Sequence, residues 1–312
     1  MQTKKLGVSG PELSVIGYGA WEAGGDAWGP NDSEETVIGA MRSAIDAGIN
    51  WIDTAEVYGD GVSEGIVGGA VGPRDDVLIA TKVAPQPEGS GFRPEEIRSA
   101  IEGSLERLGR EQIDLYQLHW PDAHGVPLED SWGAMAALQD EGMVRYLGVS
   151  NFTRELIERC EGVRHVDSLQ QEFSMLTLDD RELIAWCGRI GTGVVSYGPL
   201  GFGLLTGSLS RRDADDVTDW RRGSSDGPFT PTGLDAAFAV VDGIRPIAHR
   251  LGVSPAELAL AWNWHQPGVT SAIAGSRNPD HVRTNAAAGD LHLSTEVLEA
   301  LEDMIAREDG AT

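Results

Sequence analysis

The stretch SEETVIGAMRSAIDAGINWIDT, residues 33–54, contains a helix followed by a strand, and this pairing decides the fold. Ser33 is suited to the helix N-cap, acidic residues occupy the first turn, and Gly48 is suited to the helix stop. The residues after Gly48 form an apolar run, typical of a buried strand, that stops abruptly at Asp53. A carboxylate at the end of an apolar strand is costly unless a partner holds it.

The same alternation of strand and helix continues in both directions along the chain. Strands are expected at residues 14–20, 49–54, 76–82, 113–120, 144–151, 167–175, 192–200 and 270–276. Helical patterns separate them. Unbroken alternation implies a parallel sheet, and eight units close it into a (β/α)8 TIM barrel, an α/β fold. We expect one domain over residues 1–312.

Three segments fall outside the repeat. Residues 4–15 (KKLGVSGPELSV) predict an N-terminal β-hairpin that caps the barrel floor, and residues 294–308 predict an extra C-terminal helix. Residues 202–233 predict an unusually long connection, and connections of this length are often lids. We expect it to lie over a cofactor, with Arg221 or Arg222 as a contact.

The composition excludes several classes of function. The chain has 49 acidic and 24 basic residues, and its formal net charge of −25 argues against binding to nucleic acid or to anionic membranes. No apolar run is long enough to span a membrane, no secretory signal precedes the first strand, and the two cysteines suit reduced buried thiols. We therefore expect a cytoplasmic protein. So acidic a surface also suggests adaptation to a salty cytosol, although a base composition that favours arginine over lysine would explain it equally.

Polar side chains stand at the carboxyl ends of neighbouring strands, where barrel enzymes place their chemistry. Asp53 ends the second strand and Tyr58 follows in its loop, while Lys82 and His119 end the third and fourth strands. Taken singly, these residues also suit a helix cap, a rim charge or a satisfied core histidine. Taken together they indicate a catalytic site, the more so because only three lysines occur in the whole chain.

This set of residues suggests proton transfer by Tyr58. A tyrosine hydroxyl has an ordinary pKa of about 10, and a neighbouring ammonium lowers that pKa. We expect Lys82 to supply the ammonium, Asp53 to keep Lys82 charged and oriented, and His119 to donate a hydrogen bond to the substrate oxygen or to help move the proton. No metal site is expected.

Several further stretches resemble motifs of the aldo-keto reductases, and the pattern is most similar to the bacterial aldehyde-reductase-like branch. They are LGVSGPELSVIGYGAW, IDTAEVYG, IATKV, LERLGREQIDLYQLHWPD, GMVRYLGVSNF, GPLGFGLLTG and AGSRNPDHVRTNAAA. The resemblance covers almost the whole chain. It implies reduction of aldehydes and ketones with NADPH, with Asp53, Tyr58, Lys82 and His119 as the catalytic tetrad.

The resemblance also implies a set of cofactor contacts. Ser150, Asn151 and Gln171 would hold the nicotinamide carboxamide, and Tyr197 would stack under the nicotinamide ring. Contacts to the rest of the cofactor are expected from Gly198, Leu200, Gly203, Gly275, Ser276, Arg277, His281 and Asn285.

Two physical features support a phosphate site in this part of the chain. Glycines after the seventh strand let the backbone approach a pyrophosphate, and Arg277 precedes a helix N-terminus that suits the 2′-phosphate of NADPH. His281 stands where relatives often carry arginine or glutamine, so NADH remains an alternative cofactor. Gly198 replaces a frequent serine.

The substrate pocket is expected to be aromatic. By resemblance, Trp21 and Trp120 would form its walls together with Trp28, and such walls suit a small apolar or aromatic carbonyl compound. A rival interpretation is a nicotinamide-binding regulatory barrel, similar to the β-subunits of potassium channels, with little turnover. Monomeric and homo-oligomeric states both remain open.

Overall fold

The structure is a computed structural model that describes residues 1–25, 27–29, 33–84, 91–215, 217–221 and 227–309. Arg222, one of the two arginines expected to contact a cofactor, lies outside the described residues.

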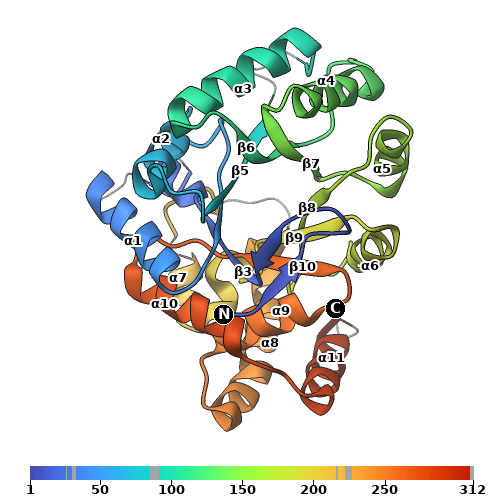
Figure 1. Ribbon diagram of the computed structural model, residues 1–312. Helices are drawn as coiled ribbons and strands as arrows, with labels where there is room; N and C mark the ends of the chain where they lie inside the picture. The colour runs from blue at the N-terminus through green and yellow to red at the C-terminus, as the bar shows by residue number, and fades with distance from the viewer. Residues whose placement is uncertain (26, 30–32, 85–90, 216, 222–226, 310–312) are drawn as a thin grey trace.

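Eight parallel strands form a closed barrel at the centre of the fold (Figure 1). They are β3 (Ile16–Gly19), β4 (Trp51–Asp53), β5 (Leu78–Val83), β6 (Ile113–Leu118), β7 (Val144–Ser150), β8 (Ser168–Glu172), β9 (Gly193–Tyr197) and β10 (Val269–Ile273). Each strand pairs with its neighbour in the chain, and β10 closes the ring against β3. The predicted (β/α)8 barrel is confirmed.

Helices surround the barrel (Figure 1). They are α1 (Glu34–Asp46), α2 (Val62–Val71), α3 (Pro94–Leu108), α4 (Leu128–Asp140), α5 (Arg154–Glu161), α6 (Arg181–Ile190), α9 (Pro255–His265) and α10 (Pro279–Ala287). The predicted C-terminal helix is α11 (Thr295–Asp309), and short 3-10 turns follow β3 (η1, Trp21–Gly24) and α10 (η4, Ala288–Asp290). Across the described ranges, none of the helices has the length and apolar character that a membrane span requires.

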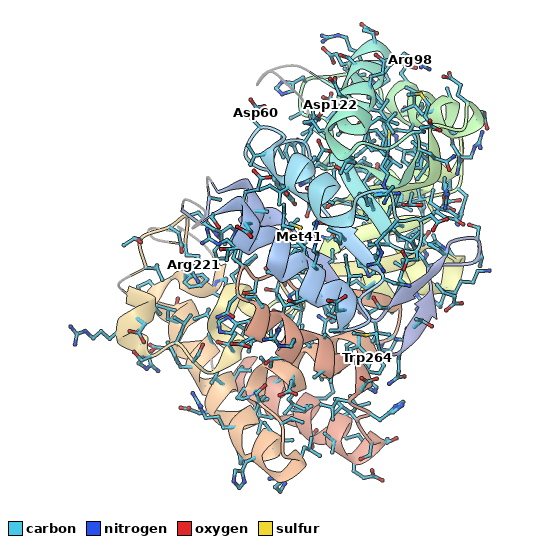
Figure 2. All side chains as sticks on the ribbon, turned by 60° about the vertical axis from the view of Figure 1, so that its left-hand side comes forward. Met41, Asp60, Arg98, Asp122, Arg221 and Trp264 are labelled. Carbon is cyan, nitrogen blue, oxygen red and sulfur yellow. The ribbon has the colours of Figure 1, made fainter. Side chains whose placement is uncertain are left out.

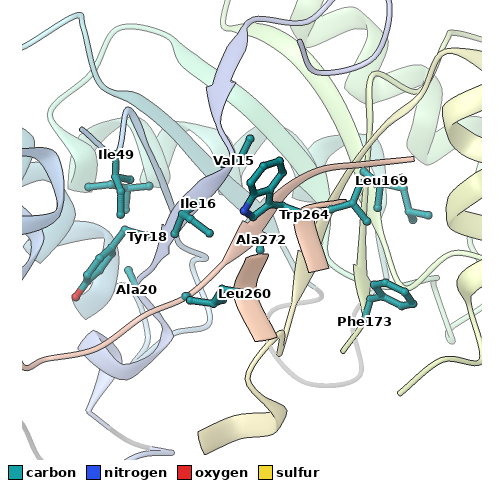
Figure 3. Packing of buried hydrophobic residues seen from close by; sticks show 14 of the residues in the cluster. Val15, Ile16, Tyr18, Ala20, Ile49, Leu169, Phe173, Leu260, Trp264 and Ala272 are labelled. Atoms are coloured by element: carbon teal, nitrogen blue, oxygen red, sulfur yellow. The ribbon is translucent and has the colours of Figure 1, made fainter. Parts of the chain in front are cut away.

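The apolar core of the barrel has two parts, because the strands bury both faces, and a third, separate cluster lies in the connection between β9 and β10. The larger part lies between strands and helices, and Figure 3 shows Ile16 and Ala272 of adjacent strands packed near Leu260 and Trp264 of α9. The smaller part fills the floor of the barrel lumen. There the predicted hairpin, β1 (Thr3–Lys5) and β2 (Glu12–Ser14), contributes buried leucines that pack with Trp51 of β4.

The long connection predicted at residues 202–233 lies between β9 and β10 and is partly helical. It contains η2 (Gly201–Thr206), α7 (Arg211–Asp215), η3 (Gly227–Phe229) and the long helix α8 (Pro231–Leu251). Thr230 caps α8 by accepting a hydrogen bond from the third residue of the helix. A proline inside α8 breaks the sequence pattern, but burial of one apolar face and packing against α11 maintain the helix.

Candidate active site

The carboxyl ends of β4 and β5 and the loop after β4 bring three of the four predicted catalytic residues together. The Lys82 ammonium donates hydrogen bonds to Asp53 Oδ2 at 2.7 Å and to the Tyr58 hydroxyl at 3.2 Å. A third bond, of 2.8 Å, goes to the carbonyl oxygen of Thr54. Lys82 therefore joins the carboxylate to the phenol, as predicted from the order of the strands.

The charge of Lys82 is maintained by its neighbours. Burial opposes a charged ammonium, but the Asp53 carboxylate and the Tyr58 hydroxyl outweigh this effect and raise the pKa of Lys82 above its ordinary value. Because Lys82 remains protonated at neutral pH, it places a fixed positive charge next to the phenol.

The effect of Lys82 on Tyr58 has the predicted direction, but it is not the largest effect. Burial raises the pKa of Tyr58, while the charge and hydrogen bond of Lys82 lower it, and the pKa remains above its ordinary value. The expectation of a lowered pKa is therefore wrong for this state of the protein. Tyr58 carries its proton and can donate it.

His119 completes the group from the end of β6. Its ring centre lies 5.7 Å from the ring centre of Tyr58, nearly perpendicular to it. Burial and the nearby Lys82 charge hold the pKa of His119 well below its ordinary value, so the imidazole is neutral. Its Nδ1 atom is buried without a hydrogen-bond partner among the described residues. A neutral imidazole of this kind can donate a hydrogen bond to a substrate oxygen, but it is a poor source of protons.

Two glycines set the position of the loop that carries Tyr58. Gly59 has a φ of 63°, and a Cβ on it would lie 2.2 Å from the carbonyl oxygen of Gly24 in η1. Conversely, a Cβ on Gly24 would lie 2.7 Å from the backbone of Tyr58. Backbone thus packs on backbone here, which brings the loop after β3 against the loop after β4.

Gln170, rather than the predicted Gln171, is the glutamine of β8 that contacts Asp53. Side chains alternate between the faces of a strand, and Gln170 of β8 points into the lumen, where its amide donates to Asp53 Oδ1 at 2.8 Å. Gln171 lies on the opposite face and donates to Asp180 at 2.6 Å, before α6. The structure therefore does not bring Gln171 to the tetrad. The alternation of side chains along a strand could have identified Gln170, because every second residue of β8 points into the lumen.

The other residues expected around the nicotinamide do gather near the tetrad. Ser150 is buried at the end of β7, and the Asn151 amide donates to the carbonyl oxygen of His119 at 3.1 Å. The Tyr197 hydroxyl donates to Asn151 Oδ1 at 2.9 Å. Asn151 has a φ of 60°, unusual for a residue other than glycine. Such strain is maintained by surrounding contacts and occurs most often at functional sites.

The segment after β9 has a backbone suited to close contact with a ligand. Gly198 and Gly203 have φ values of 65° and 104°, and Phe202 between them has a φ of 52°. Leu200 lies in the same turn and precedes the 3-10 turn η2. These left-handed residues orient several peptide groups differently from a regular helix, as phosphate-binding loops require.

The loop from β10 into α10 ends at a helix cap, Asn278. Asn278 accepts a hydrogen bond of 2.9 Å from the amide two residues ahead. Ser276 accepts one from Asn278 and lies 3.5 Å from the exposed ring of His281, while Asn285 is buried in α10. Gly275 is explained by packing, since a Cβ there would lie 2.1 Å from the carbonyl oxygen of the last residue of β3.

Arg277 makes contacts that the sequence did not suggest. Its guanidinium donates to the carbonyl oxygens of Trp28 and Gly29, each at 3.1 Å, and its backbone amide donates to Glu22 at 3.3 Å. The arginine, two positions before α10, therefore connects this loop to η1 and to a later part of the loop after β3.

Aromatic side chains cover the mouth of the barrel. The ring centre of Trp21 lies 6.3 Å from that of Tyr58 and 5.3 Å from that of Trp28. The ring centre of Trp120 lies 4.4 Å from that of His119. Trp21 and Trp120 therefore lie beside two of the predicted catalytic residues, and Trp28 packs behind Trp21.

Trp220, in the long connection, also belongs to this aromatic group, although it was not predicted. Its ring lies 5.3 Å from Trp21 and 5.6 Å from Trp28. The adjacent Arg221, labelled in Figure 2, lies over the ring of Trp28 at 5.0 Å and donates to the carbonyl oxygen of Phe202. No sequence signal distinguishes this tryptophan, because it lies more than 100 positions in the chain from Trp21 and Trp28, against which it packs.

Among the described residues, no group of three or more His, Cys, Asp or Glu side chains is arranged to hold a metal ion.

Comparison with known proteins gives a consistent result. Residues 15–306 match the sequence model of the Aldo/keto reductase family. The chain is 36% identical over 290 residues to aldo-keto reductase YhdN of Bacillus subtilis. The alignment covers 89% of this chain and 86% of that protein. Glycerol dehydrogenase AKR11B4 from Gluconobacter oxydans has a TM-score of 0.85 at 32% identity, covering 98% of this chain and 95% of that one. An aldo/keto reductase from Klebsiella pneumoniae, in complex with NADP and acetate, has a TM-score of 0.75 at 31% identity. The match covers 97% of this chain and 96% of that one.

The fold and the site together define a (β/α)8 oxidoreductase whose polar groups gather at the carboxyl ends of the strands. The chain belongs to the aldo/keto reductase family.

Proposed function

We propose that this chain, acting as one domain over residues 1–312 in the cytoplasm, reduces aldehydes or ketones to alcohols with NADPH. The observation that carries the proposal is the Lys82 ammonium, hydrogen-bonded to both the Asp53 carboxylate and the Tyr58 hydroxyl. When bound, the nicotinamide cofactor supplies the hydride. The complex of the Klebsiella relative with NADP supports this choice of cofactor.

The protein's own residues manage the proton. Tyr58 donates its hydroxyl proton to the carbonyl oxygen, and Lys82 stabilises the phenolate that remains. Asp53 keeps Lys82 charged, and neutral His119 donates a hydrogen bond to the same oxygen.

The remaining residues would hold the cofactor and the substrate. Ser150, Asn151 and Gln170 are the groups available for a carboxamide, with Gln170 taking the role first assigned to Gln171. The Tyr197 ring, the backbone of residues 198–203, and Ser276 and Arg277 would contact the rest of the cofactor. The tryptophans at the mouth favour an apolar or aromatic carbonyl substrate.

The test compares wild type with Tyr58→Phe, using NADPH consumption with a panel of aromatic aldehydes and NADPH binding by fluorescence. Tyr146→Phe, near the barrel floor, is the matched control for loss of a hydroxyl. We expect Tyr58→Phe to bind NADPH normally and to lose at least about 100-fold in kcat, since general acid catalysis contributes about that much. If wild type binds NADPH but consumes none with any carbonyl, the regulatory interpretation replaces the reductase.

A further inference from the structure

Glu22 lies next to the arginine that is proposed to bind the cofactor's 2′-phosphate. Its carboxylate accepts a hydrogen bond of 3.3 Å from the Arg277 amide and lies 3.8 Å from Arg277 Nε. Neither the tetrad nor the carboxamide contacts require this carboxylate. Its position after β3 places it between the aromatic pocket and the start of α10.

The Glu22 and Arg277 side chains are both largely removed from solvent, at 26% and 27% exposed. Burial raises the pKa of Glu22, whereas the charges of Arg277, Arg221 and His281 act in the opposite direction. One carboxylate is thus faced by basic groups from α10 and from the connection after β9. Interactions between charges are stronger here than at an open surface, because screening by solvent is weaker.

A carboxylate at this position affects phosphate and hydroxyl ligands in opposite ways. Carboxylate and phosphate are both anions that accept hydrogen bonds from a guanidinium, so they compete for it and repel each other. A ribose without a 2′-phosphate presents hydroxyl groups instead, and a carboxylate accepts hydrogen bonds from them.

We propose that Glu22 is a specificity-determining residue that weakens the preference of this protein for NADP(H) over NAD(H), by holding Arg277 and repelling the 2′-phosphate. The inference rests on the proposed function, because it assumes that a nicotinamide cofactor binds at this site.

The test measures binding of NADP⁺ and NAD⁺ separately from turnover, by calorimetry at one fixed salt concentration. In Glu22→Gln, which keeps the shape and removes the charge, we expect the ratio of the NAD⁺ to the NADP⁺ dissociation constant to rise about tenfold, as expected for loss of one partly buried like charge. Glu12→Gln removes an equal charge from the exposed hairpin at the opposite end of the barrel. There the ratio should change by less than about twofold. An unchanged or reduced ratio in Glu22→Gln overturns the proposal.

Two further variants separate this mechanism from a general change in the loop. In Arg277→Met, addition of Glu22→Gln should change the NADP⁺ affinity by less than it does with Arg277 present, because only the direct repulsion between the carboxylate and the phosphate then remains to be removed. If Glu22→Gln does not fold, Glu22→Asp shortens the side chain and should raise the ratio in the same direction by about threefold. Failure of wild type to bind either cofactor would refute the proposed function, whereas binding of both with an unaltered ratio refutes only the role of Glu22.

Discussion

The Lys82 ammonium lies 2.7 Å from the Asp53 carboxylate, and the two side chains are 0% and 4% exposed. A buried ion pair contributes little net stability when it is intact, but removal of one partner leaves a buried charge without compensation. The pair therefore connects stability to catalysis, because the same ammonium faces Tyr58.

Asp53→Asn should destabilise the protein and reduce its activity. We expect the free energy of unfolding in urea to fall by about 3 kcal/mol, because Lys82 loses its counter-charge. The double variant Asp53→Asn/Lys82→Met should be less destabilised than the sum of the two single variants. Additive losses would show that the two charges do not act as a pair.

Gly59→Ala should lower kcat more than the backbone strain of an alanine at positive φ would by itself. Its Cβ would lie 2.2 Å from the carbonyl oxygen of Gly24, so the Tyr58 loop must move, and displacement of a catalytic group costs about 100-fold in kcat. Gly109→Ala is the matched control, because Gly109 also has a φ of 63° but has no atoms within 4 Å of the added Cβ. Equal kcat values in the two variants would contradict this account.

Gln170 and Gln171 should respond differently to the same substitution. Gln170→Leu removes a hydrogen bond to Asp53, so we expect a loss of about tenfold in kcat and a shifted pH profile of kcat. Gln171→Leu removes only the contact with Asp180, so both quantities should remain close to wild type. A larger effect from Gln171 would show that the register of β8 has been misassigned.

Glu56 should make stability depend on pH near neutrality. Burial raises its pKa to about 7, despite the hydrogen bond from the Ala84 amide and the attraction of Arg107. Between the ordinary pKa of the unfolded chain and about 7, the folded protein binds more protons than the unfolded chain, so this group lowers stability as pH rises.

Glu56→Gln keeps an acceptor for the Ala84 amide and removes the ionisation. We expect it to exceed wild type in the free energy of unfolding by about 3 kcal/mol at pH 8 and to match wild type near pH 4.5. Urea titrations of both proteins at the two pH values measure this difference. A gap that does not change with pH would contradict the raised pKa.

Salt should stabilise the folded protein. The formal net charge of −25 makes the compact state repel itself, and raising salt from about 0.1 M to about 1 M shortens the screening length from about 10 Å to about 3 Å. We therefore expect Tm to rise over this range in differential scanning calorimetry. A Tm that falls or stays constant would argue against adaptation to a salty cytosol.

The sequence by itself determined the barrel and the meeting of most of the predicted catalytic residues. Strand and helix periods are local properties, and parallel closure places strand ends at one rim, so the meeting of Asp53, Lys82 and His119 followed from strand order alone. The cap of α10 by Asn278 was also local, because it depends on residues two positions apart.

Only the tertiary structure decided the features that depend on distant segments or on burial. Glu22 and Arg277 are 255 positions apart, and no local pattern relates them. The pKa of Tyr58 is raised because the closed fold removes it from water, an effect that outweighs the lysine beside it. The choice of Gln170 over Gln171 depended on which face of β8 turns toward the lumen, and the closed barrel sets that register.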